Sequence, residues 1–298
     1  MRAVAEVSTR VAMTGQAAEP PPATPYQAHR VNSVSQEEIP LVGGRSTAGV
    51  VRIGDTVHRP SGPWTPTVHR FLSHLRSRSF TGAPLPLGLD SQGREVLEYI
   101  PGETLATPQE PGGPLILVPY PEAWRSDAAL SAGGALIRSL HEASKGFTTE
   151  NANWRLCDRA MKAGEIICHA DHGPWNSVYR NGLPVALIDW DSARPDEPIL
   201  DLATAAWHFV PLVDEGEARA LGYAGVEYGR RLRAFLDAYE LENLSEFFDA
   251  LRHVKEREAD LPRFWGLGPE DASEFVMGLN RELEWLMQRN HELRLDGW

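Results

Sequence analysis

Lysine, cysteine and long apolar runs are scarce in this sequence of 298 residues. No lysine precedes Lys145, and the two cysteines, Cys157 and Cys168, have neither metal-type nor redox-type spacing. No apolar run approaches the roughly 18 residues that a membrane-spanning helix needs. Two thiols without such spacing indicate a reducing compartment. We therefore expect a cytoplasmic protein that crosses no membrane.

An excess of positive charge is also absent, because the formal net charge is −12 at pH 7. Nucleic-acid phosphates are bound by surplus Lys and Arg, so this balance argues against a nucleic-acid partner. The acidic excess is concentrated in residues 196–298, which hold 22 acidic and 11 basic side chains. A cleft lined by part of this excess would attract a cationic ligand, although solvated acidic helix faces are the commoner explanation.

The chain is predicted to begin with a disordered leader, residues 1–35, that has no apolar signal-peptide core. Residues 36–103 are predicted to form a first folded unit. Short β-type runs alternate with glycine from Ile39 to Arg59, which indicates three antiparallel strands. An amphipathic helix around residues 68–75 and two strands near 86–89 and 96–100 are expected next. Pro101-Gly102 then breaks the pattern and is the predicted hinge.

Residues 104–298 are predicted to be mainly helical, because apolar residues recur there at helical spacing. One strand pair, near 177–180 and 183–188, interrupts the helices. Asn181-Gly182 joins these strands and is the dipeptide most favoured in tight type I′ hairpins.

A polar loop precedes this hairpin, and a carboxylate follows it. The loop reads Cys168-His-Ala-Asp-His-Gly-Pro-Trp-Asn176, and Asp189 stands at the end of the returning strand. Because a hairpin brings its outer ends together, we expect Asp171, Asn176 and Asp189 to converge. Two carboxylates and an amide oxygen are hard ligands suited to Mg²⁺.

A zinc site is the alternative reading of the same loop. His169, Asp171 and His172 could act as zinc ligands of a hydrolase. No second His, Asp or Cys cluster with ligand spacing appears in the sequence, so this alternative is weaker.

The loop and hairpin together resemble the kinase signature, in which His-x-Asp-x-x-x-x-Asn precedes a strand pair and a metal-binding Asp. The following Ile-Asp-Trp-Asp and the later Pro198-Ile-Leu-Asp-Leu-Ala203 are similar to the aminoglycoside phosphotransferase family, a small-molecule kinase branch. The resemblance covers roughly residues 36 to 295. It implies an α+β, two-lobed protein-kinase-like fold, with an antiparallel β-sheet N-lobe in residues 36–103 and a mainly α-helical C-lobe in residues 104–298.

The resemblance also implies roles for the convergent residues. Asp171 would be the catalytic residue that accepts or orients the proton of the substrate hydroxyl. Asn176 and Asp189 would hold Mg²⁺ against the phosphates of ATP, and His169 would brace the loop. The expected activity is ATP-dependent phosphotransfer to a hydroxyl of a small molecule, with an antibiotic or natural-product sugar as the first expectation. The acidic C-lobe would mildly favour a cationic acceptor.

The nucleotide side of the cleft departs from the kinase pattern. Gly43 and Gly44 could fold over phosphates, although a plain hairpin turn explains them equally well. Arg59 stands where the resemblance places a strand lysine, and arginine can bind phosphate bidentately. The family's interlobe linker, whose backbone would bond the adenine edge, is similar to a segment that contains Glu98, Tyr99 and Ile100.

The acidic partner of that lysine is missing as well, because no Asp or Glu occurs between Asp55 and Asp90. This absence keeps open the alternative of a catalytically silent, kinase-like protein that binds nucleotide or regulates a partner. The presence of Asp171, Asn176 and Asp189 together opposes it, since a binding module has no need of a base beside metal ligands. Asp191 either adds to the metal site or caps the next turn, and Asp201 is expected to be an N-terminal helix cap that fastens the loop.

Overall fold

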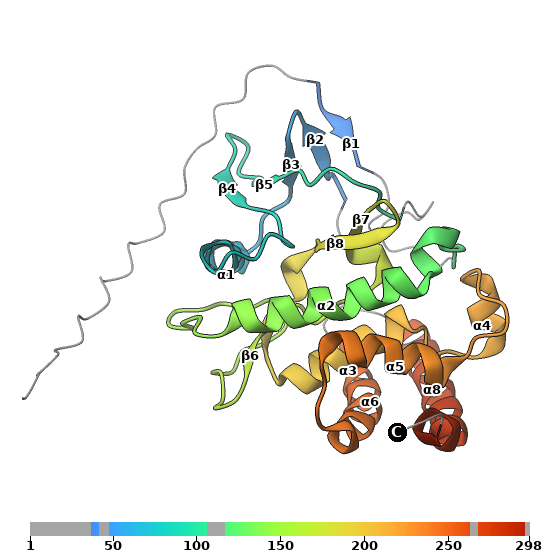
Figure 1. The fold of residues 1–298 in the computed structure, drawn as a ribbon. Helices are drawn as coiled ribbons and strands as arrows, with labels where there is room; N and C mark the ends of the chain where they lie inside the picture. The colour runs from blue at the N-terminus through green and yellow to red at the C-terminus, as the bar shows by residue number, and fades with distance from the viewer. Residues whose placement is uncertain (1–36, 42–47, 106–116, 263–267, 296–298) are drawn as a thin grey trace, which may run out of the picture.

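The computed structural model describes residues 37–41, 48–105, 117–262 and 268–295 (Figure 1). The expected disordered leader, residues 1–35, lies outside the described residues. No described helix is long and apolar enough to span a membrane.

The N-terminal part is a five-stranded antiparallel sheet, drawn at the top of Figure 1. Its strand order is β1-β2-β3-β5-β4. The bounds are β1 (Ile39–Pro40), β2 (Val51–Ile53), β3 (Thr56–Arg59), β4 (Pro86–Leu89) and β5 (Glu95–Glu98). β5 pairs with both β3 and β4, so it is an interior strand of the sheet, and its residue Val96 is fully buried.

The turn between β4 and β5 is closed by one carboxylate. Asp90 Oδ1 accepts hydrogen bonds from the backbone N–H groups of Gln92 and Arg94, each at 2.9 Å. Gly93 has a φ of 76°, a left-handed conformation that glycine adopts without strain. This side-chain-to-backbone pattern is the physical reason why Asp favours turns.

The single helix of this part, α1 (Thr65–Ser77), begins at a Thr-Pro pair and packs against residues of the helical part. Proline suits the first turn because it lacks the N–H that would have no partner there. Phe71 is fully buried, and its ring centroid lies 5.2 Å from that of Phe147 and 5.9 Å from that of Trp190. Phe71 therefore ties α1 to two separate segments of the helical part.

The rest of the chain is mainly helical and lies below the sheet in Figure 1. Its α-helices are α2 (Asp127–Ser144), α3 (Pro198–Phe209), α4 (Glu215–Ala220), α5 (Tyr228–Tyr239), α6 (Leu244–Glu258) and α8 (Pro269–Leu295). Short 3₁₀ helices are η1 (Glu122–Arg125), η2 (Pro174–Asn176) and η3 (Trp190–Ser192). α2 crosses this part and contacts α5 on one side and β8 on another.

The contact between α2 and α5 depends on a glycine. A Cβ atom added to Gly134 would lie 2.3 Å from the carbonyl oxygen of Phe235. The two helix backbones approach so closely because position 134 carries no side chain. α2 itself starts at the N-cap Ser126, whose side chain accepts a hydrogen bond from Ala129 N.

This part also contains two small antiparallel sheets, of which the β7–β8 hairpin lies between α2 and the N-terminal sheet (Figure 1). β7 (Ser177–Arg180) pairs with β8 (Leu183–Leu187), and β6 (Ile166–Cys168) pairs with β9 (Arg194–Asp196). The β7–β8 hairpin was expected, whereas the β6–β9 pair and the short helix α4 were not. The α+β prediction is confirmed.

The expected hinge is bonded to the hairpin. Glu103 and Tyr179 exchange two backbone hydrogen bonds, at 2.8 and 2.7 Å. A Cβ atom on Gly102 would lie 2.6 Å from Tyr179 O, so this position requires glycine. The boundary between residues 103 and 104 stays a prediction, and these contacts show how the two parts are joined there.

Candidate active site

The β7–β8 hairpin brings the polar loop and Asp189 together. Its turn has φ values of 53° at Asn181 and 77° at Gly182, as a type I′ turn requires. At the open end of the hairpin, Ile188 N donates to Asn176 O at 2.9 Å. Asp189 follows directly in a left-handed conformation, with φ 62° and ψ 65°. The local geometry predicted from Asn-Gly is therefore present.

A buried histidine holds the loop to the same strand end. His169 has no exposed surface, and its Nε2 donates to Ile188 O at 2.9 Å. Its other ring nitrogen, Nδ1, accepts from Asp171 N at 3.3 Å. Burial lowers the pKa of His169 to about 3, so the ring is neutral and can donate at one nitrogen and accept at the other. The predicted bracing role agrees with these contacts.

Asp171 and Asn176 contact each other directly. Asn176 Nδ2 donates to Asp171 Oδ2 at 2.9 Å and to Asp171 O at 2.9 Å. Both amide hydrogens are used in this way, so the amide oxygen of Asn176 is the atom left to face a cation. Asp171 itself is only partly exposed.

The pKa of Asp171 is raised to about 7, first by burial and then by the negative charge of Asp189. The hydrogen bond from Asn176 opposes this shift. A carboxylate whose pKa lies near neutral pH is suited to accept a proton during a reaction. Asp189 is therefore close enough for its charge to act on the Asp171 carboxylate.

Arg59 joins the site from β3. Its Nη1 lies 3.0 Å from Asp189 Oδ1, and its Nη2 lies 2.6 Å from Asp191 Oδ2. Arg155 also approaches Asp191 Oδ2, at 3.3 Å. Burial alone would lower the pKa of Arg59, but Asp189, Asp191 and Glu95 raise it above its ordinary value. Arg59 is therefore permanently charged, and Asp191 is an ion-pair partner and not merely a turn cap.

The two predicted ligand residues, Asn176 and Asp189, fit a magnesium ion beside the predicted base, Asp171. Oxygen donors are available from Asp171, from the amide of Asn176 and from Asp189, whose side chain keeps 34% of its exposure. Arg59 bonds one oxygen of Asp189, which leaves the second oxygen for a cation. This donor set matches the preference of Mg²⁺ for a few protein oxygens shared with waters and phosphates.

Asp201 supports the loop from α3. It was expected to be an N-cap, and this prediction is wrong, because α3 begins at Pro198 with Glu197 as its N-cap. The expected fastening role is present, since Asp201 Oδ1 accepts from Ala170 N at 2.9 Å. The helix starts four residues earlier than the cap assignment required, and Asp201 reaches the loop from its first turn.

Two buried histidines share the other oxygen of Asp201. His172 Nε2 and His141 Nε2 donate to Asp201 Oδ2 at 2.6 and 2.9 Å. Burial would raise the pKa of Asp201, but these two histidines together hold it well below its ordinary value. Direct hydrogen bonds of this length leave no space for a metal ion between the three side chains. His169 and His172 bind different partners, so the zinc alternative gains no support.

The structure describes only some of the predicted nucleotide-binding residues, and the backbone amides of two of them are already hydrogen-bonded. Gly43 and Gly44 lie outside the described residues. The amides of Glu98 and Tyr99 donate to Leu85 O at 2.8 Å and to Asp55 O at 2.9 Å, so neither amide is available to an adenine base. Within the described part of the chain, the Ile100 amide has no backbone acceptor. The adenine contact predicted for this linker stays a prediction that rests on its carbonyl groups and on Ile100.

Part of the acidic excess of the C-terminal third is neutralised beside the loop. Lys255 is buried and lies 3.1 Å from Glu258 and 2.8 Å from Glu282. Glu258 raises the pKa of Asp171 slightly, whereas Arg194 lowers it. Charges of both signs, one on α6 and one on β9, therefore act on Asp171, and a cationic acceptor stays a prediction.

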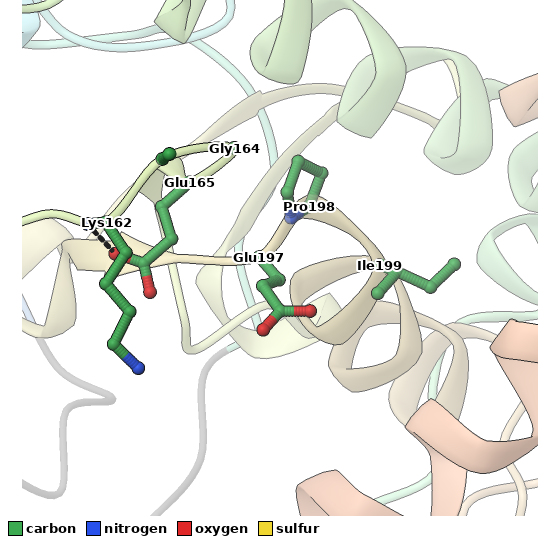
Figure 2. Close-up of a pocket in the computed structure, with 7 residues that line it drawn as sticks. Lys162, Gly164, Glu165, Glu197, Pro198 and Ile199 are labelled. Atoms are coloured by element: carbon green, nitrogen blue, oxygen red, sulfur yellow. Dashed lines mark hydrogen bonds between the residues drawn. The ribbon is translucent and has the colours of Figure 1, made fainter.

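A surface pocket of about 360 Å³ lies at the other end of the β6–β9 pair, between residues 162–165 and 197–199 (Figure 2). Cys168 pairs with Arg194 at the loop end of this sheet, whereas Ile166 pairs with Asp196 at the pocket end. Glu165 is held there by Arg159 and by Lys162 N. The pocket contains none of the predicted site residues, so we place the site at the loop.

Sequence reasoning missed Glu95, His69 and Arg155. Glu95 Oε2 lies 3.4 Å from Arg59 Nε, and Glu95 Oε1 lies 3.0 Å from His69 Nε2. Glu95 is the cross-strand partner of Arg59 in the β3–β5 pair. The signal that could have found it was the register of two strands that are not neighbours in sequence.

The chain was compared with known proteins. The profile of the phosphotransferase enzyme family (APH) matches residues 113–239. The trifolitoxin immunity protein of Rhizobium leguminosarum bv. trifolii is 38% identical over 211 residues, which are 69% of this chain and 75% of that protein.

Two solved structures share the fold. The amicoumacin kinase hAmiN, in complex with AMP-PNP, Ca²⁺ and Ami, matches with a TM-score of 0.53 and 13% identity over 80% of this chain and 86% of its own. The ADP-bound aminoglycoside phosphotransferase APH(2'')-Ib matches with a TM-score of 0.52 and 13% identity over 85% of this chain and 94% of its own. These likenesses confirm the two-lobed, protein-kinase-like fold.

Proposed function

The chain belongs to the phosphotransferase enzyme family, and from this membership we propose that it transfers the γ-phosphate of ATP, with Mg²⁺, to a hydroxyl of an antibiotic or toxin-like small molecule. As a family member it is a phosphotransferase whose acceptor group is an alcohol. The nucleotide, the metal ion and the acceptor class are the proposed parts. One observation carries the proposal, namely the convergence of Asp171, Asn176 and Asp189 at the open end of the hairpin.

In this proposal Asp171 is the general base. The acceptor oxygen attacks the γ-phosphorus, the bond from phosphorus to the β,γ-bridging oxygen breaks, and ADP leaves with the electron pair of that bond. The acceptor proton passes to a carboxylate oxygen of Asp171. The hydrogen bond from Asn176 Nδ2 fixes the orientation of this carboxylate, which keeps it within reach of the hydroxyl.

Asn176 and Asp189 would hold Mg²⁺, which neutralises charge on the phosphates when it is bound. Arg59 adds a permanent positive charge at the same place, because its guanidinium lies against Asp189 and Asp191. The same guanidinium would supply positive charge beside the phosphate oxygens without a change of its orientation. Positioning and charge neutralisation supply most of what phosphoryl transfer requires.

The proposed class of acceptor is inferred from the proteins to which this chain is similar. One relative is named an immunity protein against trifolitoxin, and the solved structures with the same fold include an amicoumacin kinase and aminoglycoside phosphotransferases. A role in immunity to an antibiotic or a toxin fits these relatives. Charges of both signs near Asp171 allow the acceptor to carry an amine, although they do not require one.

A second candidate function is a silent, nucleotide-binding relative, and one contact favours it. Arg59 already pairs with Asp189 and Asp191, so a metal ion must compete with a guanidinium for these carboxylates. Stable Mg·ATP binding without turnover would be the sign of this function.

The test is a coupled ADP-release assay over a panel of hydroxylated antibiotics, with ATP and then GTP as donor. The wild type is compared with Asp171→Asn and with Asp237→Asn, a matched change on the exposed face of α5. We expect acceptor-stimulated ADP release that Asp171→Asn reduces by at least about a hundredfold and Asp237→Asn leaves unchanged. Release that is insensitive to Asp171→Asn, or nucleotide binding without release on any acceptor, contradicts the proposal.

A further inference from the structure

We propose that Glu95 is a positioning residue that holds Arg59 toward the nucleotide site, in the role that an acidic residue on a helix plays in kinases. The proposal rests on the function proposed above. It resolves the absence of any acid between Asp55 and Asp90, because the acid comes from β5 and not from α1.

The sheet register places Glu95 beside Arg59. The two residues are directly opposite in the antiparallel β3–β5 pair, so their side chains leave the same face of the sheet. Arg59 Nε lies 3.4 Å from Glu95 Oε2, and the two side chains keep only 8% and 3% of their exposure. A buried charge of each sign needs its partner, so neither side chain is free to turn away.

The second oxygen of Glu95 is bound as well. Glu95 Oε1 lies 3.0 Å from Nε2 of His69, which projects from α1 and has no exposed surface. One carboxylate oxygen thus faces β3 and the other faces α1. His69 fixes the rotation of the carboxylate. The carboxylate faces the Nε edge of the guanidinium as a buried ion pair without a hydrogen bond, because Arg59 Nε has no hydrogen-bond partner among the described residues.

Fixing that edge determines where the rest of the guanidinium points. The guanidinium is planar, and its five N–H groups have a rigid arrangement. With Nε against Glu95, the Nη1 and Nη2 groups face Asp189 and Asp191 at 3.0 and 2.6 Å. Without Glu95, Arg59 would keep its charge and its hydrogen bonds to Asp189 and Asp191, but it would lose the carboxylate that faces its Nε edge.

The position of Glu95 on a strand, and not on a helix, has a functional consequence. Where the acid stands on a helix, movement of that helix can break the ion pair and switch a kinase off. Here Arg59 and Glu95 belong to two hydrogen-bonded neighbours of one sheet. The pair therefore forms whenever the sheet forms, and a shift of α1 would remove only the contact from His69.

A double-mutant cycle on nucleotide binding separates positioning from a purely structural role. The binding of AMP-PNP with Mg²⁺ is measured by titration calorimetry for the wild type, Glu95→Gln, Arg59→Gln and the double variant. Glu142→Gln, a glutamate that pairs with Lys145 on the surface of α2, is the matched control. We expect Glu95→Gln to weaken binding about tenfold in the wild-type background and less than about twofold in the Arg59→Gln background.

His69 gives a second test if Glu95→Gln folds poorly. Replacing His69 by Leu removes the contact to Glu95, and we expect binding about three- to tenfold weaker. Replacing it by Gln retains an N–H donor near the position of Nε2, and we expect binding within about twofold of the wild type.

The outcomes separate this inference from the proposed function. If the wild type does not bind AMP-PNP with Mg²⁺, both are wrong. If the wild type binds and transfers phosphate, two results overturn the positioning role alone. One is unchanged binding by Glu95→Gln, and the other is an equal loss with and without Arg59.

Discussion

Replacing Asp171 by Asn should make the folded protein more stable at neutral pH while it removes activity. Burial and the charge of Asp189 raise the pKa of Asp171 to about 7, from about 4 in an unfolded chain. The folded protein therefore binds this proton more tightly than the unfolded chain does. Between pH 4 and pH 7 the unfolded chain releases the proton first, so the free energy of unfolding of the wild type falls as the pH rises.

The size of the effect follows from the displaced pKa. Each pH unit of displacement corresponds to about 1.4 kcal/mol, which sets an upper limit of about 4 kcal/mol at pH 8. Asp171 is partly exposed, so solvent screens part of this cost, and we expect about 1–2 kcal/mol. Asn keeps an oxygen that can accept from Asn176 Nδ2, so the main loss on substitution is the unfavourable charge.

The assay is urea unfolding of the wild type and Asp171→Asn, without nucleotide or metal ion, at pH 5 and pH 8. The variant should be more stable at pH 8, and the difference should shrink toward pH 5. The slope of the free energy against urea concentration should be equal for both proteins, which shows that the same surface unfolds. A variant that is less stable than the wild type at pH 8, or a difference that does not depend on pH, would refute this reasoning.

Three further changes have defined outcomes. Asn176→Leu removes the amide oxygen and the donor to Asp171, so we expect the Mg²⁺-dependent affinity for nucleotide to fall about tenfold in titration calorimetry. An unchanged affinity would mean that the Asn176 side chain holds no metal ion. Arg59→Lys keeps the positive charge but loses the bidentate geometry of the guanidinium, so we expect kcat/KM in the coupled assay to fall about ten- to a hundredfold. A kcat/KM equal to that of the wild type would show that the charge alone suffices. Gly134→Ala places a Cβ atom against Phe235 O, and we expect it to lower the free energy of unfolding by about 1–3 kcal/mol. A free energy of unfolding equal to that of the wild type would show that α2 can move away from α5 at no cost.

The hairpin and its loop could be predicted because their signals are local. Asn181-Gly182 determines a type I′ turn, and a two-residue turn fixes which residues oppose each other. The convergence of Asp171, Asn176 and Asp189 follows from that register. The strands of the N-terminal sheet were predictable for the same reason, since glycine and the turn at Asp90 separate them.

The features that could not be predicted from the sequence depend on contacts between segments that are far apart in the chain. β6 and β9 pair across the whole hairpin, and three apolar residues in a row do not reveal their partner. Glu95 meets Arg59 only because β5 lies between β4 and β3 in the sheet. A search of the sequence for an acid on the helix after β3 could not find an acid on a later strand.

Asp201 shows how a small error in an element boundary changes a role. A helix that began next to Asp201 would make it a cap, but the helix begins at Pro198 and places Asp201 inside its first turn. From there one oxygen reaches the Ala170 amide and the other binds two histidines. Helix ends are the least certain feature of a sequence pattern, and side-chain roles near them are correspondingly uncertain.

The most direct measurement of the central claim is a crystal structure of the wild type with AMP-PNP and Mg²⁺. The account predicts a metal ion about 2.0–2.1 Å from the amide oxygen of Asn176 and from a carboxylate oxygen of Asp189, with the γ-phosphate facing Asp171. A nucleotide bound elsewhere, or a metal ion coordinated without Asn176 and Asp189, would contradict it.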